Sequence, residues 1–516
     1  RAQGFVNLPA GGVDFRLAFI ASEGDGYIRN TVDNRRFAED DYWGVRGSLR
    51  VDTSDAWILD VMAQHIRDDG ATGDLWTPNP LYLPDPHDIR LTTVTLENPY
   101  LVSEIDSLSI NLEYDLGFAS FRSISGYVRS NVRNVDDCAG EPFLNNCFRF
   151  SDPNDFDQWS QELQLVFPRS GSLEGIVGAY YSDADAELGF FQLLPVVNLQ
   201  PLNNNLTTRS EPYAAIFGQL TWHFAERWTS TAGLRFSREE LRVASIGSGV
   251  NDTHTLFTDE TDSDNFSWLL DVTYAVTDDL MLYASASTGN KSGGFVTASP
   301  PNGIPHAYGP EHVTAFEVGE KSEWLDGRLM LNAAAFLYDY DDLQVSNPII
   351  VDGVPIFGVD NAAEARIHGL DAETSYALTE QWALSGGVVW LPEREFVEYD
   401  QGNQSLSGNK LVRAPEWSAR AAVDYERAVG ELGRLSARLE YSYRSSYYYT
   451  AENLPEYSQD SFGLLNAYLR FESASESWYV FASGRNLTSE DYFTQVFFQS
   501  SPGYPDTYEV GFGIRF

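Results

Sequence analysis

Histidine and cysteine, the residue types that most often carry catalysis or hold metals, are few in this chain of 516 residues. The histidines show neither the spacing of a zinc-binding pair nor a place in a hydrolase elbow or phosphate loop. We therefore expect solvated or interfacial histidines rather than metal ligands, no cofactor and no enzymatic activity. The seven histidines are His65, His87, His223, His254, His306, His312 and His368.

Aromatic side chains gathered in three polar segments are stronger candidates for binding. Exposed aromatic rings can stack on a catecholate ring or a sugar face, or cap a cationic complex. The alternative is that these rings pack loop against loop or belong to an interfacial girdle. The candidate substrate-binding residues are Trp76, Tyr82 and His87 in one segment, Phe295, His306 and Tyr308 in a second, and Tyr447 and Tyr448, next to Tyr449, in a third.

The two cysteines, Cys138 and Cys147, lie in one polar segment between two strand patterns. An even cysteine count in an exported chain predicts a disulfide, here one that closes a short loop. A metal site would need further ligands, and none lie nearby in the sequence.

The polar segments that carry these candidate residues are expected to connect β-strands, because apolar and polar residues alternate strictly in much of the chain. The last nine residues show this most clearly, since one face of an extended strand would be wholly apolar. An ordinary edge strand of a soluble sheet is the alternative for this segment. The apolar face holds Tyr508, Val510, Phe512, Ile514 and Phe516, and the other face holds Glu509, Gly511, Gly513 and Arg515.

Long alternating segments with a charged second face predict an all-β fold, a transmembrane antiparallel β-barrel over residues 1–516. No stretch approaches the ~18 consecutive apolar residues that a spanning helix needs. A barrel instead carries its apolar surface on every second residue. Residues 434–444, for example, are apolar at odd positions and polar or charged at even positions. No linker or low-complexity tract divides the chain.

Connections between the predicted strands are either short turns or long loops, as in outer-membrane barrels. Five tryptophans lie near short turns, where an interfacial girdle would place them: Trp57, Trp222, Trp324, Trp382 and Trp478. Counting between turns predicts about twenty-one strands. Because a closed barrel of this type has an even number, we expect a parent barrel of about 22 strands, a size typical of plugged transporters. The plug and first strand would then precede Arg1.

The net charge of −41 and the pI near 4.3 argue against nucleic acid as a partner. The acidic residues concentrate in segments predicted to be loops, such as residues 259–264 and 339–342. They could bind cations, directly or through divalent ions shared with lipopolysaccharide, but a solvated acidic surface is the favoured interpretation. An acidic lining would favour a neutral or cationic ligand over an anionic one.

Several ordered motifs make the chain resemble the barrel of a TonB-dependent outer-membrane receptor over essentially its whole length. The most specific block comprises residues 317–322, 326–329 and 336–342. Residues 282–284 with 292–295, and residues 484–487 with Tyr492, resemble further parts of that barrel, and residues 4–9, 15–18 and 25–28 resemble its early strands.

This resemblance implies energised import across the bacterial outer membrane, with a plug in the lumen and a TonB energy-coupling protein acting on the missing N-terminal region. The expected partners are outer-membrane lipid, lipopolysaccharide and a scarce small ligand, most simply a ferric siderophore. An oligosaccharide or a cobalamin-like ligand is the second choice of substrate. Haem is disfavoured because the motif pair of haem receptors is absent around His306 and His312. A passive, porin-like or adhesive barrel is the competing functional class.

Overall fold

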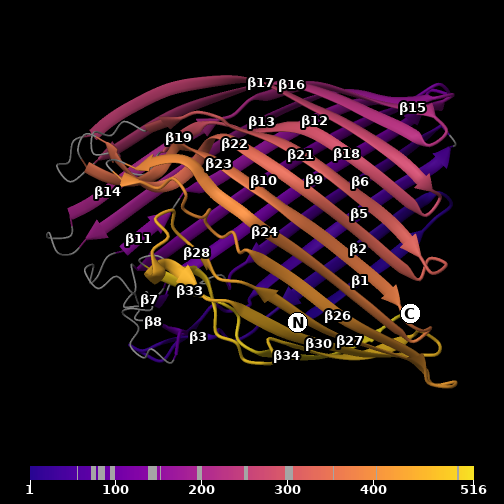
Figure 1. Ribbon diagram of the computed structural model, residues 1–516. Helices are drawn as coiled ribbons and strands as arrows, with labels where there is room; N and C mark the ends of the chain where they lie inside the picture. Colours follow the sequence, from indigo (N-terminus) through magenta and orange to yellow (C-terminus); the bar gives the residue numbers. More distant parts are fainter. Residues whose placement is uncertain are drawn as a thin grey trace.

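The chain forms one curled antiparallel sheet whose strands run obliquely around a central lumen (Figure 1). In this computed structural model, twenty-one wall strands follow one another in chain order, each hydrogen-bonded to the next, with β1 and β34 at the two edges. The predicted barrel fold and strand count are confirmed. The described residues are 1–54, 56–70, 77–78, 88–92, 99–137, 148–151, 153–194, 200–248, 254–296, 306–351, 354–401, 404–496 and 499–516.

The wall strands differ widely in length. They are β1 (Ala2–Pro9), β2 (Val13–Ser22), β5 (Tyr42–Ser54), β6 (Trp57–Asp68), β9 (Tyr100–Asp115), β10 (Ser120–Asp137), β12 (Asn154–Ser170), β13 (Leu173–Leu194), β15 (Tyr213–Ala225), β16 (Trp228–Ser248), β17 (His254–Thr277), β18 (Leu280–Lys291), β21 (Glu311–Trp324), β22 (Leu329–Val351), β23 (Val354–Ala377), β24 (Trp382–Gln401), β26 (Trp417–Ala428), β27 (Gly433–Arg444), β30 (Phe462–Ser473), β31 (Trp478–Arg485) and β34 (Thr507–Ile514). Within the described ranges, no helix is long and apolar enough to cross a membrane.

The two ends of the wall differ in their connections. Short turns join β1 to β2, β5 to β6 and eight further pairs at one end, as the sequence predicted, and we call this the short-turn end. The remaining connections lie at the opposite, long-loop end, on the left in Figure 1. Small elements decorate that end: β3 (Ile28–Asn30), β4 (Arg36–Phe37), β7 (Thr77–Pro78), β8 (Leu91–Thr92), β11 (Phe148–Ser151), β14 (Gln200–Ser210), β19 (Gly294–Val296), β20 (His306–Tyr308), β25 (Gln404–Ser405), β28 (Tyr447–Tyr448), the 3-10 turn η4 (Pro455–Tyr457), β29 (Ser458–Gln459), β32 (Phe493–Val496) and β33 (Gln499–Pro502).

Alternation along each strand gives the wall an apolar outer face. In β34 the exposed fractions of Val510 and Phe512 are 84% and 61%, as expected for side chains that face lipid. The pairing register continues this face from strand to strand, for instance from Val510 to Ala482 and from Phe512 to Val480. The predicted apolar face of the last strand is therefore confirmed.

Tryptophans mark both borders of the apolar band. Trp382 and Trp390 face outward eight residues apart on β24, which is about 20 Å along the barrel axis at ~3.3 Å per residue and a tilt of ~40°. That height approaches the ~25 Å of the apolar band of outer-membrane barrels. The row nearer the short turns holds Trp57, Trp222, Trp228, Trp324, Trp382 and Trp478, and the row nearer the long loops holds Trp43, Trp159, Trp268, Trp390 and Trp417.

Two acidic segments do not lie in loops, and these predictions were wrong. Residues 259–264 belong to β17 and residues 339–342 to β22, because both strands continue well beyond the apolar band. Arginines on the neighbouring strands neutralise part of the acid: Arg238 lies 3.0 Å from Asp262, and Arg366 lies 2.6 Å from Asp339. Cross-strand ion pairing thus allows acidic sequence to remain extended.

The edges of the sheet, β1 and β34, face each other across a seam. Among the described residues, β1 pairs only with β2 and β34 only with β31. Loop contacts bridge the seam at the long-loop end, where Tyr27 lies 5.3 Å from Tyr504 between ring centroids and Arg90 lies 2.7 Å from Asp491. Loop contacts therefore connect the first and last parts of the wall at the long-loop end of the seam.

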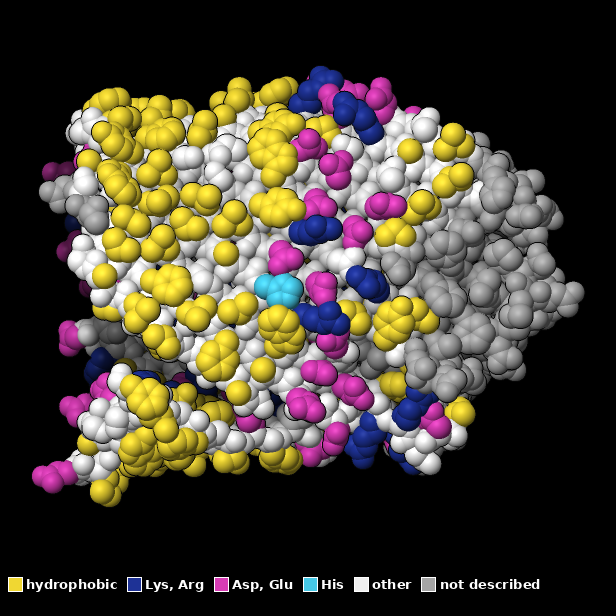
Figure 2. All heavy atoms as spheres, turned by 180° about the vertical axis from the view of Figure 1, so that it is seen from behind, with side chains coloured by type: hydrophobic (Ala, Val, Ile, Leu, Met, Phe, Trp, Pro, Cys, Tyr) yellow, Lys and Arg dark blue, Asp and Glu magenta, His cyan; other side chains and the backbone are white. Residues whose placement is uncertain are grey.

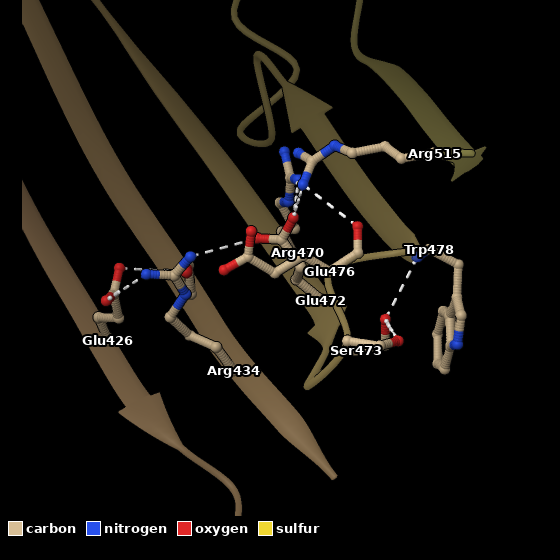
Figure 3. Close-up of polar contacts among 10 residues, drawn as sticks. Glu426, Arg434, Arg470, Glu472, Ser473, Glu476, Trp478 and Arg515 are labelled. Atoms are coloured by element: carbon tan, nitrogen blue, oxygen red, sulfur yellow. Dashed lines mark hydrogen bonds and ion pairs between the residues drawn. The ribbon is translucent and has the colours of Figure 1, made fainter.

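At the short-turn end, one carboxylate joins the last strands of the wall (Figure 3). Glu472 of β30 is nearly buried and lies 3.3 Å from Arg434, 3.0 Å from Arg470 and 2.5 Å from Arg515. These arginines come from β27, β30 and the residue after β34. Because Glu472 contacts all three on the lumen side, the cluster cross-links the final strands at this end.

Candidate functional site

The structure describes half of the aromatic candidates in full. Trp76, Tyr82 and His87 lie outside the described residues, as do Cys138 and Cys147, so their predicted roles stay predictions. The backbone of His306 pairs with Val296 in the β19–β20 hairpin, and Tyr308 pairs with Gly294 there.

Phe295 is buried rather than exposed, with an exposed fraction of 7%. It packs with Leu241 and Val243 of β16, and its ring centroid lies 6.3 Å from that of Phe257 on β17. Exposure was expected from the polar sequence around it. The hairpin instead folds onto the tall β16–β17 extension, so the packing alternative describes the ring of Phe295.

Tyr447 and Tyr449 also act as packing residues at the long-loop end. The exposed fraction of Tyr447 is 8%, and its ring meets that of Tyr449 edge-on at 5.3 Å. The Tyr449 hydroxyl donates to the carbonyl oxygen of Phe493 at 2.6 Å. Burial is the main cause of the raised pKa of Tyr449, which Arg413 and Arg444 partly oppose. Tyr448, half-buried, pairs with Ser458.

Two arginines beside this cluster were missed by the sequence analysis. Arg413 is exposed, and its guanidinium carbon lies 5.8 Å from the ring centroid of Tyr449. Its backbone φ of 54° is in the left-handed region, which is uncommon for a side chain of this size. Its amide donates to the carbonyl of Tyr448 at 2.8 Å, and its Nη2 donates to Gln495 at 3.3 Å.

Arg444 ends β27 and points into the lumen, because the outward positions of that strand are the odd-numbered ones. It is exposed and, over the described ranges, has no carboxylate within 4.0 Å. Both Arg413 and Arg444 act electrostatically on the phenol of Tyr449, and Arg444 acts on that of Tyr492 as well. We refer to Arg413 and Arg444 as the mouth arginines.

The alternation of residues 434–444 did place Arg444 on the wet face, so one signal for it was present in the sequence. That Arg413 lies near the same tyrosine was not predictable, because 30 residues and a separate loop lie between it and Arg444. Contacts between loops, rather than strand periodicity, bring them together.

The lumen wall is not uniformly acidic, contrary to the expected acidic lining. The lumen face of β17–β23 holds mainly carboxylates, including Asp271, Glu317, Glu323, Asp371 and Glu373. The lumen face of β26–β34 is rich in arginine: Arg420, Arg434, Arg438, Arg444, Arg470, Arg485 and Arg515. Carboxylates of the same face pair with several of these arginines, as Asp424 and Glu440 do with Arg438, so this sector is rich in arginine without being free of acid.

On the outer face, charged side chains of both signs form a belt between the apolar band and the long loops (Figure 2). Pairs are frequent in this belt: His65 lies 2.7 Å from Asp106, and His368 lies 3.1 Å from Glu393. Arg67 pairs with Glu104, and Arg242 lies 3.8 Å from Glu260. Over the described ranges, no group of three or more metal-ligating residues is arranged to hold a metal ion.

A hollow of about 530 Å³ lies against β1, β2, β5, β6 and β9, lined among others by Arg16, Arg50 and Asp60. It lies toward the short-turn end, next to Pro9 and Asp14, and so is remote from the aromatic candidates. Arg50 and Asp60 pair there at 3.1 Å. Because Arg50 and Asp60 satisfy each other and the hollow is remote from the aromatic candidates, we give the long-loop mouth priority as a binding surface.

Residues 42–487 match the family model described as TonB dependent receptor-like, beta-barrel. The pesticin receptor of Yersinia pestis is 22% identical over 410 residues, covering 78% of this chain and 56% of that protein. The metal-pseudopaline receptor CntO of Pseudomonas aeruginosa is 28% identical over 212 residues, covering 40% of this chain and 27% of that protein. The match thus covers little more than half the length of the pesticin receptor and about a quarter of that of CntO.

Solved structures resemble the whole chain. The ferric yersiniabactin uptake receptor FyuA from Yersinia pestis superimposes with a TM-score of 0.84 at 18% identity, covering 99% of this chain and 76% of that chain. At this identity the likeness establishes the fold.

Proposed function

The chain belongs to the TonB-dependent receptor-like β-barrel family of the outer membrane, and we propose that it forms the wall of an active importer for a ferric siderophore-like chelate. The family consists of transporters and receptors, and its short-turn end faces the periplasm and its long-loop end the medium. The match of the family model to residues 42–487 is the observation that carries the proposal.

A plug domain and one further wall strand complete the importer in this proposal. The free edges of β1 and β34 support the added strand, because a paired strand between them would remove both edges and give an even number. A plug in the lumen would make transport depend on the TonB protein. The expected coupling region lies in that plug and not in the wall.

The chemistry of the ligand is supported by names among the relatives and by the mouth of the barrel. Relatives are described as receptors for ferric yersiniabactin and metal-pseudopaline, which are metal chelates. We retain Trp76, Tyr82, His87, His306 and Tyr308 as proposed ligand contacts. Phe295, Tyr447 and Tyr448 are proposed to support the site from beneath, in keeping with the burial of Phe295 and Tyr447. Lipopolysaccharide remains the proposed neighbour of the outer charged belt.

A passive barrel is the alternative class, and a growth experiment separates the two. The gene is expressed in an iron-starved Gram-negative host that lacks its own siderophore receptors, with and without a functional TonB system, and single ferric chelates are supplied. We expect at least one chelate to restore growth only when TonB is present. Equal growth with and without TonB would favour the porin-like alternative.

A further inference from the structure

The β16–β17 hairpin extends farther at the long-loop end than the neighbouring strand β18 (Figure 1). β17 pairs with β16 as far as His254, but with β18 only from Leu269 to Thr277. β18 pairs with β21 as far as Lys291. Among the described residues, the part of β17 over residues 256–267 therefore has no strand partner on the β18 side. We call this part the open edge of β17.

Side chains satisfy some of the backbone groups along the open edge. The amide of Trp268 donates to the hydroxyl of Thr288 on β18 at 3.2 Å instead of to a strand carbonyl. Because amides alternate between the two sides of a strand, those of the even-numbered residues 258–266 point to the same side. One of them, the amide of Glu260, donates to the carboxylate of Asp259 at 2.9 Å. An edge of this length is a template for an added strand.

A second free edge, on β22, differs from the open edge of β17 in its protection. Beyond Asp341, β22 no longer pairs with β21 in the described part of the chain. The carboxylate of Glu311 accepts from the amide of Gln344 there at 2.9 Å, and Pro348 follows in the same strand. Proline limits further pairing of an edge strand. Residues 256–267 contain no proline, so the edge of β17 stays accessible to a partner strand.

The charge of the open edge determines which strands it accepts. Glu240 of β16 lies opposite Asp262 and adds to the acid of β17. Two arginines of β16 offset part of this charge, since Arg238 lies 3.0 Å from Asp262 and Arg242 lies 3.8 Å from Glu260. The remaining acid repels a second copy of the same edge and attracts a cationic strand. The exposed carboxylates of the open edge are Asp259, Glu260, Asp262 and Asp264.

A hollow of about 230 Å³ opens at the end of this edge, where β17 leaves β18. Phe266 borders it with an exposed fraction of 61%. In complexes formed by strand addition, backbone hydrogen bonds hold the added peptide and such pockets take individual side chains. The hollow is lined, among others, by Phe266, Trp268, Thr288, Asn290, His312 and Thr314.

We propose that the open edge of β17 binds an extended cationic peptide segment, which adds to the wall as a further strand. The even-numbered residues of β17 exchange backbone hydrogen bonds with the peptide. Its lysines or arginines lie opposite Glu260, Asp262 and Asp264, which share the outer face of the hairpin with Phe266. This interaction is independent of the proposed import function.

Binding of synthetic peptides to the purified receptor tests the proposal. Receptor in phosphatidylcholine nanodiscs, without lipopolysaccharide, is titrated with a short fluorescent peptide of alternating lysine and valine, and the fluorescence anisotropy is measured. A second peptide has the same sequence with N-methylated backbone amides, so it keeps the charge but cannot donate to a strand. We expect the unmodified peptide to bind at least about tenfold more tightly, because several backbone hydrogen bonds are lost on methylation.

Variants of the receptor locate the site. Thr258→Pro removes an amide from the open edge and places a ring there, whereas Thr258→Val is the matched control that favours the strand. We expect proline to weaken binding of the unmodified peptide about tenfold and valine to leave it unchanged. The double change Glu260→Gln and Asp264→Asn should weaken binding at low salt and less at high salt. Its control is Glu431→Gln, in the short turn between β26 and β27.

Equal affinity for the two peptides would reduce the interaction to adsorption on an acidic surface and overturn the proposal. Absence of binding, or binding that Thr258→Pro leaves unchanged, would overturn it as well. Dimerisation of the receptor in detergent that Thr258→Pro abolishes would assign the edge to a second copy of the chain instead. If Thr258→Pro failed to assemble, the comparison of the two peptides would still decide.

Discussion

The long-loop end of the wall carries arginines on both faces, and the arginines of the two faces have different contacts. On the outer belt, Arg238 and Arg366 lie within 3.0 Å and 2.6 Å of a carboxylate on a neighbouring strand. On the inner side, Arg413 lies over the ring of Tyr449 and donates to the amide of Gln495, and Arg444 faces the lumen opposite Phe462 of β30. These arginines of the belt are therefore neutralised by carboxylates of the wall, whereas no carboxylate lies within 4.0 Å of Arg413 or Arg444 among the described residues.

This contrast separates two uses of the same residue type. A paired arginine stabilises extended acidic strands and contributes little more, because exposed ion pairs are worth roughly 0–1 kcal/mol. An arginine without a carboxylate keeps its donors for a ligand. In a chain of net charge −41, whether a basic residue is paired with a carboxylate thus says more about its role than its presence does.

The largest effect should come from placing a charge on the wrong face of the wall. Ala334 and Ala335 are neighbours on β22 that face the lumen and the lipid, respectively. We expect Ala335→Arg to lower the free energy of unfolding by about 2–4 kcal/mol, as for a cationic side chain near the bilayer midplane. Ala334→Arg is the matched control, because Asp371 lies opposite it. Urea unfolding in lipid vesicles measures both, and equal losses would contradict the assignment of faces.

A smaller loss should follow removal of the shared carboxylate at the periplasmic end. Glu472→Gln leaves Arg434, Arg470 and Arg515 clustered without their common partner. We expect the free energy of unfolding to fall by about 1–3 kcal/mol, the usual result of removing one side of a charged hydrogen bond. Glu426→Gln is the control, since Arg434 keeps Glu472. If both variants unfolded alike, the cluster would not fix the last strands.

The free energy of unfolding should fall at high pH because of the tyrosines at the long-loop end of the seam. Burial raises the pKa of Tyr27 to about 12. Because the folded protein favours the neutral phenol, this contribution is fully present below pH ~10, the pKa of an unfolded tyrosine, and is lost between pH ~10 and ~12. Thermal unfolding of the protein and of Tyr27→Phe over this range checks the sign. A wild-type curve that matched the variant would contradict it.

The smallest effect should be on the outer belt. Arg238→Ala removes pairs with Asp262 and Asp264, at 3.0 and 3.9 Å. We expect a loss of about 0–1 kcal/mol that shrinks further at high salt. Denaturant unfolding at low and high ionic strength measures it. A loss above that of Glu472→Gln would reverse the proposed difference between the two regions.

Much of the wall was predictable from the sequence, because a strand of a barrel is specified by local alternation. Alternation in residues 434–444 and in the last nine residues predicted which face of each strand meets lipid, and the short turns allowed the strands to be counted. How far β16, β17 and β22 continue beyond the apolar band was not predictable. Residues 259–264 are polar throughout, and the backbone ladder to β16 together with the ion pairs of Arg238 and Arg242 keeps them extended.

The mouth was less predictable for a related reason. Burial of Phe295 depends on Leu241 and Val243 of β16, and burial of Tyr447 depends on loops that come together only in the folded protein. Sequence polarity suggested exposure for all of these segments. It could not distinguish a ring that supports a site from one that contacts a ligand.

Accumulation against a gradient tests energised import most directly. Cells that carry the receptor are given a radiolabelled ferric chelate that supports TonB-dependent growth, and its concentration inside the outer membrane is compared with that in the medium, with and without prior addition of an uncoupler. We predict a ratio well above one in energised cells and a ratio far below one in cells uncoupled before the chelate is added, because the proposed plug blocks passive entry. A ratio near one in energised cells, unaffected by the uncoupler, would contradict active import and identify a passive barrel.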